Sequence, residues 1–291
     1  MVLISASRRT DIPAFFSPWF IQRIEKGYCK VANPFNPNQI RKVSLLPQDV
    51  EGIVFWTKNP GPIFSYLPFL NQKGYHYIFQ FTLTPYGSLL EPEVPSLENR
   101  IKLMQKLGER LGTERVIWRF DPLIFTEEMD FDFFARMFSI LLDRLNPFIS
   151  RIITSRFSPY RSAKNRLKKR GIELLPLDKH SHEFEELIWF MQKQAELKGL
   201  KLESCADKGL QELGVCSSGC INGDYWRGVT GNGQYPKDSG QRGDCKCVKS
   251  VDIGAYGTCP HLCLYCYGYR GRKQVEQNFK AHNPESVALG G

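Results

Sequence analysis

Short apolar runs alternate with amphipathic stretches along the first two-thirds of the chain. The runs are rich in β-branched and aromatic residues, which favours β-strands, and they cover residues 2–6, 52–56, 75–83, 115–120, 151–154 and 200–204. The stretches between them repeat apolar residues at helical spacing, as in Leu97, Ile101 and Met104. This alternation of strand and helix predicts an α/β fold whose parallel sheet is closed or partly closed into a barrel.

Three local patterns add detail to this prediction. Ser17 followed by Pro18 is typical of a helix N-terminus, and we expect that helix to run to about Gly27. Residues 28–46 break the strand–helix rhythm with two closely spaced prolines, which indicates a loop or a hairpin. Residues 160–170 form a strongly basic stretch that we expect to be helical.

Polar and charged side chains stand in or directly after the predicted strands. Nine of them are candidate site residues: Arg8, Arg9, Asp11, Lys58, Asn59, Gln80, Arg119, Asp121 and Arg156. In parallel α/β folds the chemistry takes place at the carboxyl ends of the strands, so we expect these residues to line one site. Side-chain alternation should place Arg119 and Asp121 on one face and the neighbouring aromatic residues on the other. The alternative is that the charged groups pair with one another at the rim of the sheet.

The character of the chain changes after Cys205. Gly, Asn, Asp, Ser and Cys dominate residues 214–247, and little periodicity remains. An irregular stretch of this length needs a staple, which a bound metal would supply. We therefore divide the chain into barrel strands and helices at 1–204, a cysteine-rich metal-binding insertion at 205–249, and a strand–loop–helix unit at 250–291 that completes the barrel.

Composition narrows the class of protein. With 291 residues, 42% hydrophobic and 24% charged, the chain has a globular profile that excludes a mostly disordered, collagen-like or coiled-coil protein. No apolar run is long enough to cross a bilayer, and the N-terminus lacks a signal-peptide pattern, so we expect a cytoplasmic protein without a membrane partner.

The charge is strongly basic and unevenly distributed. The net charge is +9, and residues 151–180 alone carry nine Lys or Arg against two acidic residues. This excess favours an anionic partner, either a small molecule or nucleic acid. A solvated helix face is the alternative interpretation of the basic run.

Cysteine spacing carries the clearest chemical signal. Eight of the nine cysteines fall between Cys205 and Cys266, and three of them, Cys259, Cys263 and Cys266, form a C-x3-C-x2-C motif. Three thiolates can bind three irons of a [4Fe–4S] cluster and leave the fourth iron open. With Tyr265 before the last cysteine, this motif resembles that of radical S-adenosylmethionine enzymes, in which the cofactor chelates the open iron. A structural zinc site is the alternative. His261, inside the motif, is expected to pack within its loop.

The remaining cysteines predict a second metal site. Four thiolates close such a site, and we assign Cys205, Cys220, Cys245 and Cys247 to it, with Cys216 as a spare or alternate ligand. The metal is either an auxiliary iron–sulfur cluster or zinc, and the sequence leaves both open.

Longer motifs identify a resemblance to a known family. Near the C-terminus these are QRGDCKC (241–247), SVDIGAY (250–256) and CPHLCLYCY (259–267), and in the first half SRRTDIP (7–13), VFWTKNP (54–60) and RFDP (119–122). With them the chain resembles, over nearly its whole length, the bacterial family called domain of unknown function 1848. The resemblance implies a C-terminal cysteine cluster like that of radical S-adenosylmethionine proteins. It also favours the same four cysteines for the second site, and it implies no reaction.

The position of the cysteine motif suggests a circular permutation. Radical S-adenosylmethionine enzymes carry the motif after the first barrel strand, whereas here it lies 25 residues before the end of the sequence. We therefore expect residues 250–255 to form a barrel strand beside the N-terminal strand, with the cysteine loop next and a helix from about residue 274 to 282. The glycine–glycine–glutamate segment that holds the cofactor's amino group in that family is absent, and residues 7–11 would take its place.

These observations lead to a hypothesis for function. We expect an iron–sulfur, radical S-adenosylmethionine-type enzyme that acts on an anionic substrate and receives electrons from a flavodoxin or ferredoxin. Arg8, Arg9, Asp11, Lys58, Arg119 and Asp121 are the candidate catalytic residues, and Asn59, Gln80 and Arg156 are candidate cofactor-binding residues. The motifs at 58–60 and 119–122 resemble those of spore photoproduct lyase-like proteins, which points towards nucleic acid. The alternatives are a barrel with structural metal sites that binds nucleic acid or acts as a non-radical hydrolase, and a pure electron relay.

Overall fold

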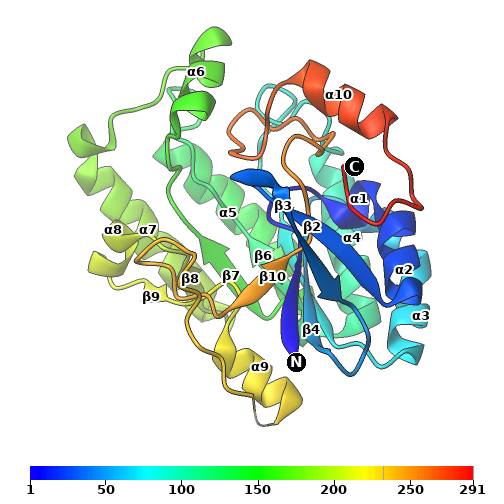
Figure 1. Ribbon diagram of the computed structural model, residues 1–291. Helices are drawn as coiled ribbons and strands as arrows, with labels where there is room; N and C mark the ends of the chain where they lie inside the picture. Colours follow the sequence, from blue (N-terminus) through cyan, green and yellow to red (C-terminus); the bar gives the residue numbers. More distant parts are fainter. Residues whose placement is uncertain (232, 291) are drawn as a thin grey trace.

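An eight-stranded sheet in which every pairing is parallel forms the centre of the molecule (Figure 1). The computed structural model describes residues 1–231 and 233–290. In spatial order the strands are β10 (Ser250–Asp252), β1 (Val2–Ala6), β4 (Val50–Thr57), β5 (Tyr77–Thr82), β6 (Val116–Arg119), β7 (Arg151–Thr154), β8 (Leu202–Ser204) and β9 (Cys216–Ser217). The predicted α/β class and parallel sheet are confirmed. Within the described residues, β10 and β9 are the two edges of this sheet.

The last strand in the sequence lies beside the first. β10 pairs in parallel with β1, with Leu3 opposite Ser250 and Ser5 opposite Asp252. This confirms the predicted neighbour of the N-terminal strand, although β10 ends earlier than expected. The cysteine loop and α10 (Arg272–Lys280) follow, so the C-terminal segment adds the strand next to β1 and then a helix.

The long helices of residues 1–204 pack on one face of the sheet and join it in the larger hydrophobic core. In chain order the helices are α1 (Ile12–Phe15), α2 (Ser17–Lys26), α3 (Leu67–Gln72), α4 (Leu97–Leu111), α5 (Phe131–Leu145), α6 (Arg161–Lys169), α7 (Ser181–Leu197), α8 (Lys208–Glu212), α9 (Gly223–Thr230) and α10, with short 3-10 turns at Gly61–Tyr66, Thr113–Arg115, Asn146–Phe148 and Leu177–Lys179. Two of the long helices begin at side-chain caps, since Ser96 and Asp130 accept from backbone N–H groups of α4 and α5. The predicted basic helix is α6.

One predicted helix start is off by a residue. Ser17 is the first residue of α2 and not its cap, and Phe16 occupies the cap position. The reason is the short helix α1 directly before it: the Ser17 hydroxyl donates to the carbonyl of Pro13, 2.7 Å away, and so belongs to the α1–α2 corner.

The cysteine-rich segment covers the other face of the sheet. Strand residues that alternate with the helix-facing ones form a second core with it, and its strand members are Leu3, Val54, Ile78, Ile117 and Ile153. Trp226 of α9 packs on this layer directly over Gly52, where a Cβ atom would lie 2.2 Å from the indole ring. Sequence reasoning predicted only an irregular insertion here, but the segment also contributes β9 to the main sheet.

A separate hairpin accounts for residues 28–46. β2 (Tyr28–Asn33) and β3 (Asn36–Ser44) pair antiparallel and form their own two-stranded sheet. Its tip, with Pro34 and Phe35, reaches over the carboxyl end of the main sheet (Figure 1). No described helix is both long and apolar enough to span a bilayer.

Candidate functional site

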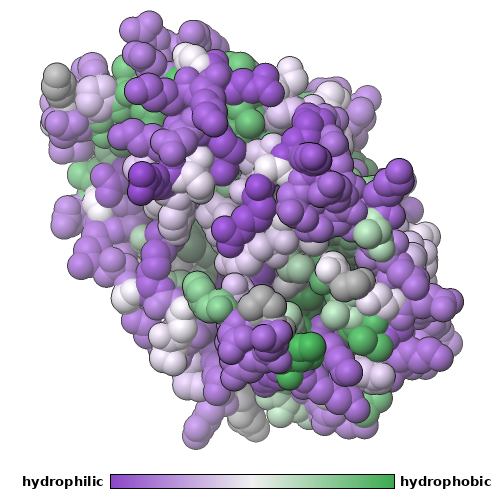
Figure 2. Space-filling view, turned by 45° about the horizontal axis from the view of Figure 1, so that its top comes forward, coloured by the Kyte–Doolittle hydropathy of each residue, from purple (hydrophilic) through white to green (hydrophobic). Residues whose placement is uncertain are grey.

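The carboxyl ends of the strands open into a cavity of about 660 Å³. Figure 2 is turned towards this end of the molecule, where mostly hydrophilic residues surround a hollow. Most of the predicted site residues line the cavity: Arg8, Arg9, Asp11, Lys58, Arg119, Asp121, Arg156, Cys205, Cys220, Cys245, Cys247, Cys259, Cys263 and Cys266. Asn59 and Gln80 are not among its lining residues. The structure therefore gathers both cysteine sets and the charged strand-end residues around one space.

The three-cysteine loop follows β10 and is held by backbone hydrogen bonds. Leu264 N donates to Leu90 O at 2.9 Å. Arg166 of α6 reaches over the loop and donates to the carbonyls of Leu264 and Cys266. Burial raises the pKa of Cys259 to about 12 and that of Cys263 well above the usual thiol value. A metal that binds these thiols would therefore have to displace their protons.

Asp11 joins the N-terminal strand end to the cysteine loop. Its side chain caps α1, accepts from the backbone N–H of Lys58 at 2.7 Å, and lies 2.9 Å from His261 Nε2. The other ring nitrogen of His261 lies 3.3 Å from the carbonyl of Glu93. We expected His261 to pack within its own loop, but both of its ring nitrogens contact residues outside the loop.

Glu91 is a buried carboxylate that sequence reasoning missed. It lies 2.7 Å from Lys58 Nζ and 3.2 Å from Arg100 Nη1, and it accepts from the hydroxyl of Tyr265 at 2.5 Å. Burial alone would raise the pKa of Glu91, but the Lys58 and Arg100 cations outweigh it and lower the pKa. A single Glu in an irregular segment gives no spacing signal, so only the fold reveals this contact.

Asp252, at the end of β10, was also missed. It accepts hydrogen bonds from the hydroxyls of Ser5 and Ser7 at 2.8 and 2.7 Å and from Arg8 N at 2.8 Å. Gly254 completes the contact, because a Cβ atom there would lie 2.1 Å from Ser7 Oγ. Asp252 therefore fixes the turn that carries Arg8 and Arg9 into the cavity.

The other four predicted cysteine ligands form a second group, the cysteine tetrad: Cys205, Cys220, Cys245 and Cys247. The Sγ atoms of Cys205 and Cys220 are 2.7 Å apart, and Cys247 contacts both Cys220 and Cys245. The hydrogen bond from Cys247 lowers the pKa of Cys245 to about 7. Gln80 donates to the carbonyl of Cys220 at 2.7 Å and so supports the tetrad from β5. Cys216 is exposed on β9, apart from the cavity.

Two arginines beside the tetrad both contact the ring of Trp56. The guanidinium carbons of Arg8 and Arg119 lie 4.9 and 5.1 Å from the centre of the Trp56 ring. Arg119 donates to Cys220 Sγ at 2.9 Å and is also paired with Asp121. Arg8 Nη2 is buried without a hydrogen-bond partner among the described residues. The predicted alternative, pairing at the rim, thus holds for Arg119 and Asp121, and also for Arg156 with Asp207.

The donor chemistry of the two groups suits soft metal centres. All seven candidate ligands are thiols, which favour iron–sulfur clusters and zinc over magnesium or calcium. Arg8 and Arg119 would offset part of the negative charge of four thiolates. Among residues 1–231 and 233–290, no three His, Cys, Asp or Glu side chains are already arranged to hold a single ion. To share one zinc ion, the Sγ atoms of Cys205 and Cys220, which are 2.7 Å apart, would have to separate to about 3.8 Å. A four-iron cluster takes its thiolates at separate corners and would also require them to move apart.

Comparisons with known proteins identify a family and no reaction. The family model described as Domain of unknown function (DUF1848) matches residues 3–268. Neither the curated proteins nor the solved structures gave a match.

Proposed function

The chain belongs to the DUF1848 family, and from the geometry of its site we propose that it is an iron–sulfur enzyme of the radical S-adenosylmethionine type. Cys259, Cys263 and Cys266 would hold a [4Fe–4S] cluster. The tetrad would hold a second iron–sulfur cluster or zinc. The substrate would be an anion bound in the cavity between the two groups.

One observation carries this proposal. Three cysteines within eight residues line a cavity at the carboxyl end of a parallel sheet, and the loop that bears them offers no fourth ligand. His261 is the loop's only other residue of a ligand type, and Asp11 and a backbone carbonyl occupy its nitrogens. A cluster held there would keep one iron open towards the cavity.

Strand order supports a permuted relation to the radical S-adenosylmethionine fold. In that relation β10 takes the place of the first strand, the cysteine loop follows it, and β1 takes the place of the second strand. The turn after β1, with Arg8 and Arg9, then stands where the missing glycine–glycine–glutamate segment would lie. We propose that it contributes to binding the methionine end of the cofactor.

The chain's own residues would position and enclose the reacting groups. A reduced [4Fe–4S] cluster held by these cysteines would supply the single electron that reductive cleavage of a bound sulfonium requires. Lys58 and Glu91 fix the loop through Tyr265. The cationic side chains at the cavity wall would attract an anionic substrate. An external one-electron donor, such as a flavodoxin or ferredoxin, completes the electron balance.

Electron paramagnetic resonance tests the proposal directly. The chain is purified without oxygen, reconstituted with iron and sulfide, reduced with dithionite, and measured with and without S-adenosylmethionine. We expect a [4Fe–4S] signal that changes when the cofactor is added. Cys263→Ser should abolish the cofactor-sensitive signal, while Cys216→Ser, a cysteine outside both groups, should retain it. A cluster signal indifferent to the cofactor, or zinc as the sole bound metal, would overturn the radical assignment.

A further inference from the structure

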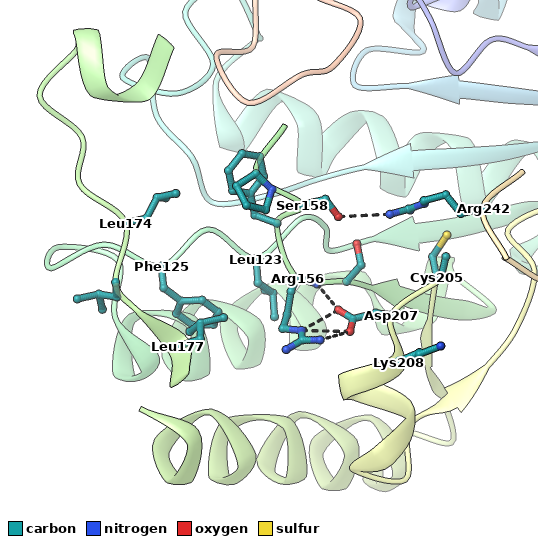
Figure 3. Close-up of a pocket in the computed structure, with 15 residues that line it drawn as sticks. Leu123, Phe125, Arg156, Ser158, Leu174, Leu177, Cys205, Asp207, Lys208 and Arg242 are labelled. Atoms are coloured by element: carbon teal, nitrogen blue, oxygen red, sulfur yellow. Dashed lines mark hydrogen bonds and ion pairs between the residues drawn. The ribbon is translucent and has the colours of Figure 1, made fainter. Parts of the chain in front are cut away.

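A second cavity of about 470 Å³ lies beside the first, and the proposed function assigns no ligand to it. It opens between the segments that follow β7 and β8 and the irregular segment at 174–177 (Figure 3). The two cavities share lining residues, among them Ser158, Cys205 and Arg242. This side cavity therefore ends against the cysteine tetrad.

One side of the side cavity is apolar. In Figure 3, Leu174, Phe125 and Leu177 lie together, away from Arg242 and Cys205. Phe125 is buried, and a backbone hydrogen bond of 3.0 Å from Leu175 to Phe125 holds the leucine segment against it. The leucines are only half-buried, so they present apolar surface that a ligand could cover.

The opposite side carries one cation without a carboxylate partner. Arg156 is neutralised by Asp207, whose Oδ1 lies 2.7 Å from Arg156 Nη2, and Lys208 lies 3.4 Å from Asp244. Arg242 differs, because it donates a single 3.3 Å hydrogen bond to Ser158 Oγ and forms no ion pair with any described carboxylate. One unpaired guanidinium beside a hydroxyl matches one singly charged, planar anion.

We propose that the side cavity binds a small amphipathic carboxylate. The carboxylate would lie at Arg242 and Ser158, next to the tetrad, and an apolar chain or ring would lie against the leucines and Phe125. The cavity volume falls within the range of small-molecule sites, and the few convergent polar groups fix the orientation. This inference does not depend on the proposed radical chemistry. The residues proposed to bind the carboxylate are not metal ligands, and Cys205 is the one proposed metal ligand that lines the side cavity.

Isothermal titration calorimetry with octanoate tests the inference on the full chain as purified. Octanoate supplies both parts of the ligand, octan-1-ol lacks the charge, and acetate lacks the apolar chain. We expect saturable octanoate binding and at least tenfold weaker binding of the other two compounds.

Two variants locate the binding to the side cavity. Arg242→Gln should weaken octanoate binding at least tenfold by removing the charge-assisted hydrogen bonds, and Leu174→Asp should do so by placing a carboxylate in the apolar wall. Arg110→Gln, which removes an exposed arginine on α4, is the matched control and should leave binding unchanged. Absent octanoate binding, or equal affinity in Arg242→Gln and the parent chain, would overturn the inference. Both variants alter partly or fully exposed side chains, and circular dichroism verifies their folding.

Discussion

At the scale of single residues, Glu91 shows how one buried carboxylate organises the site. It forms ion pairs with both Lys58 and Arg100 and accepts from Tyr265, the residue before the last cysteine of the loop. These partners come from the end of β4, from α4 and from the C-terminal loop. One side chain thereby links three distant parts of the chain beneath the proposed cluster.

Replacing Glu91 by Gln should destabilise the chain by about 3–5 kcal/mol at neutral pH, because it leaves the buried Arg100 and the partly buried Lys58 without their shared counter-charge. The pKa of Glu91 is lowered in the folded chain. Its stabilising effect is therefore complete above its unfolded pKa, about 4.3, and is lost as the pH falls through the lower folded pKa. Urea unfolding at several pH values measures this difference.

Glu98→Gln is the matched control for that experiment. Glu98 also pairs with an arginine, Arg144, but both side chains are exposed, so we expect little change in stability. If the two variants lose the same stability, the assigned role of Glu91 is wrong.

At the scale of elements, the close contact between β4 and α9 determines how the cysteine-rich segment sits on the sheet. Gly52 leaves room for the Trp226 ring, which is fully buried. Aliphatic side chains of the neighbouring strands form the rest of the layer on which the cysteine-rich segment packs. The tetrad can therefore reach the carboxyl end of the sheet only if α9 seats closely on this face.

Gly52→Ala should disturb that contact. The new methyl group would lie 2.2 Å from the Trp226 ring, and overpacking of this kind typically costs about 1–3 kcal/mol. Gly228→Ala is the control, since Gly228 lies in α9, the helix that carries Trp226, and has open space around it. There the change should stabilise by up to about 1 kcal/mol. Chemical denaturation of both variants measures the difference, and a neutral Gly52→Ala would contradict this account.

At the scale of the whole molecule, the proposed second metal would link the stability of the fold to the metal content of the chain. Cys205 and Cys220 flank β9, while Cys245 and Cys247 precede β10, so a metal at the tetrad would tie the two edge regions of the sheet together. Metal that binds only the folded chain adds its binding free energy to stability.

Chelation should therefore lower the thermal midpoint of the reconstituted chain. We expect Cys220→Ser to start from a lower midpoint and to respond less to the chelator, because its second site is already broken. Cys216→Ser should behave like the parent chain. Differential scanning calorimetry together with metal analysis measures both quantities, and an unchanged midpoint after metal loss would contradict a stapling role for the tetrad.

Local patterns in the sequence were sufficient to predict the six main strands and the longer helices of residues 1–204. Side chains alternate in β6 and in the residues just after it, which predicted that Arg119 and Asp121 lie on one face and the aromatic residues on the other. In the structure Arg119 and Asp121 line the cavity. Trp118 and Phe120 lie in the core that the sheet shares with the helices. The positions of the cysteines in the sequence likewise predicted two groups of thiols, and in the structure both groups line one cavity. These signals are readable because backbone geometry fixes the side-chain period within each element.

Contacts between residues far apart in the sequence were decided only by the tertiary structure. Glu91 and Tyr265 are 174 residues apart, and Asp252 reaches Ser7 across 245. Glu91 stands in no motif, and the motif at 250–256 that contains Asp252 does not indicate its contacts, because these depend on which strands become neighbours. The sequence by itself therefore determined the parallel α/β framework and the chemical types gathered at its end. The folded sheet alone determined which buried charges meet, because burial and distance, rather than residue type, control their interaction.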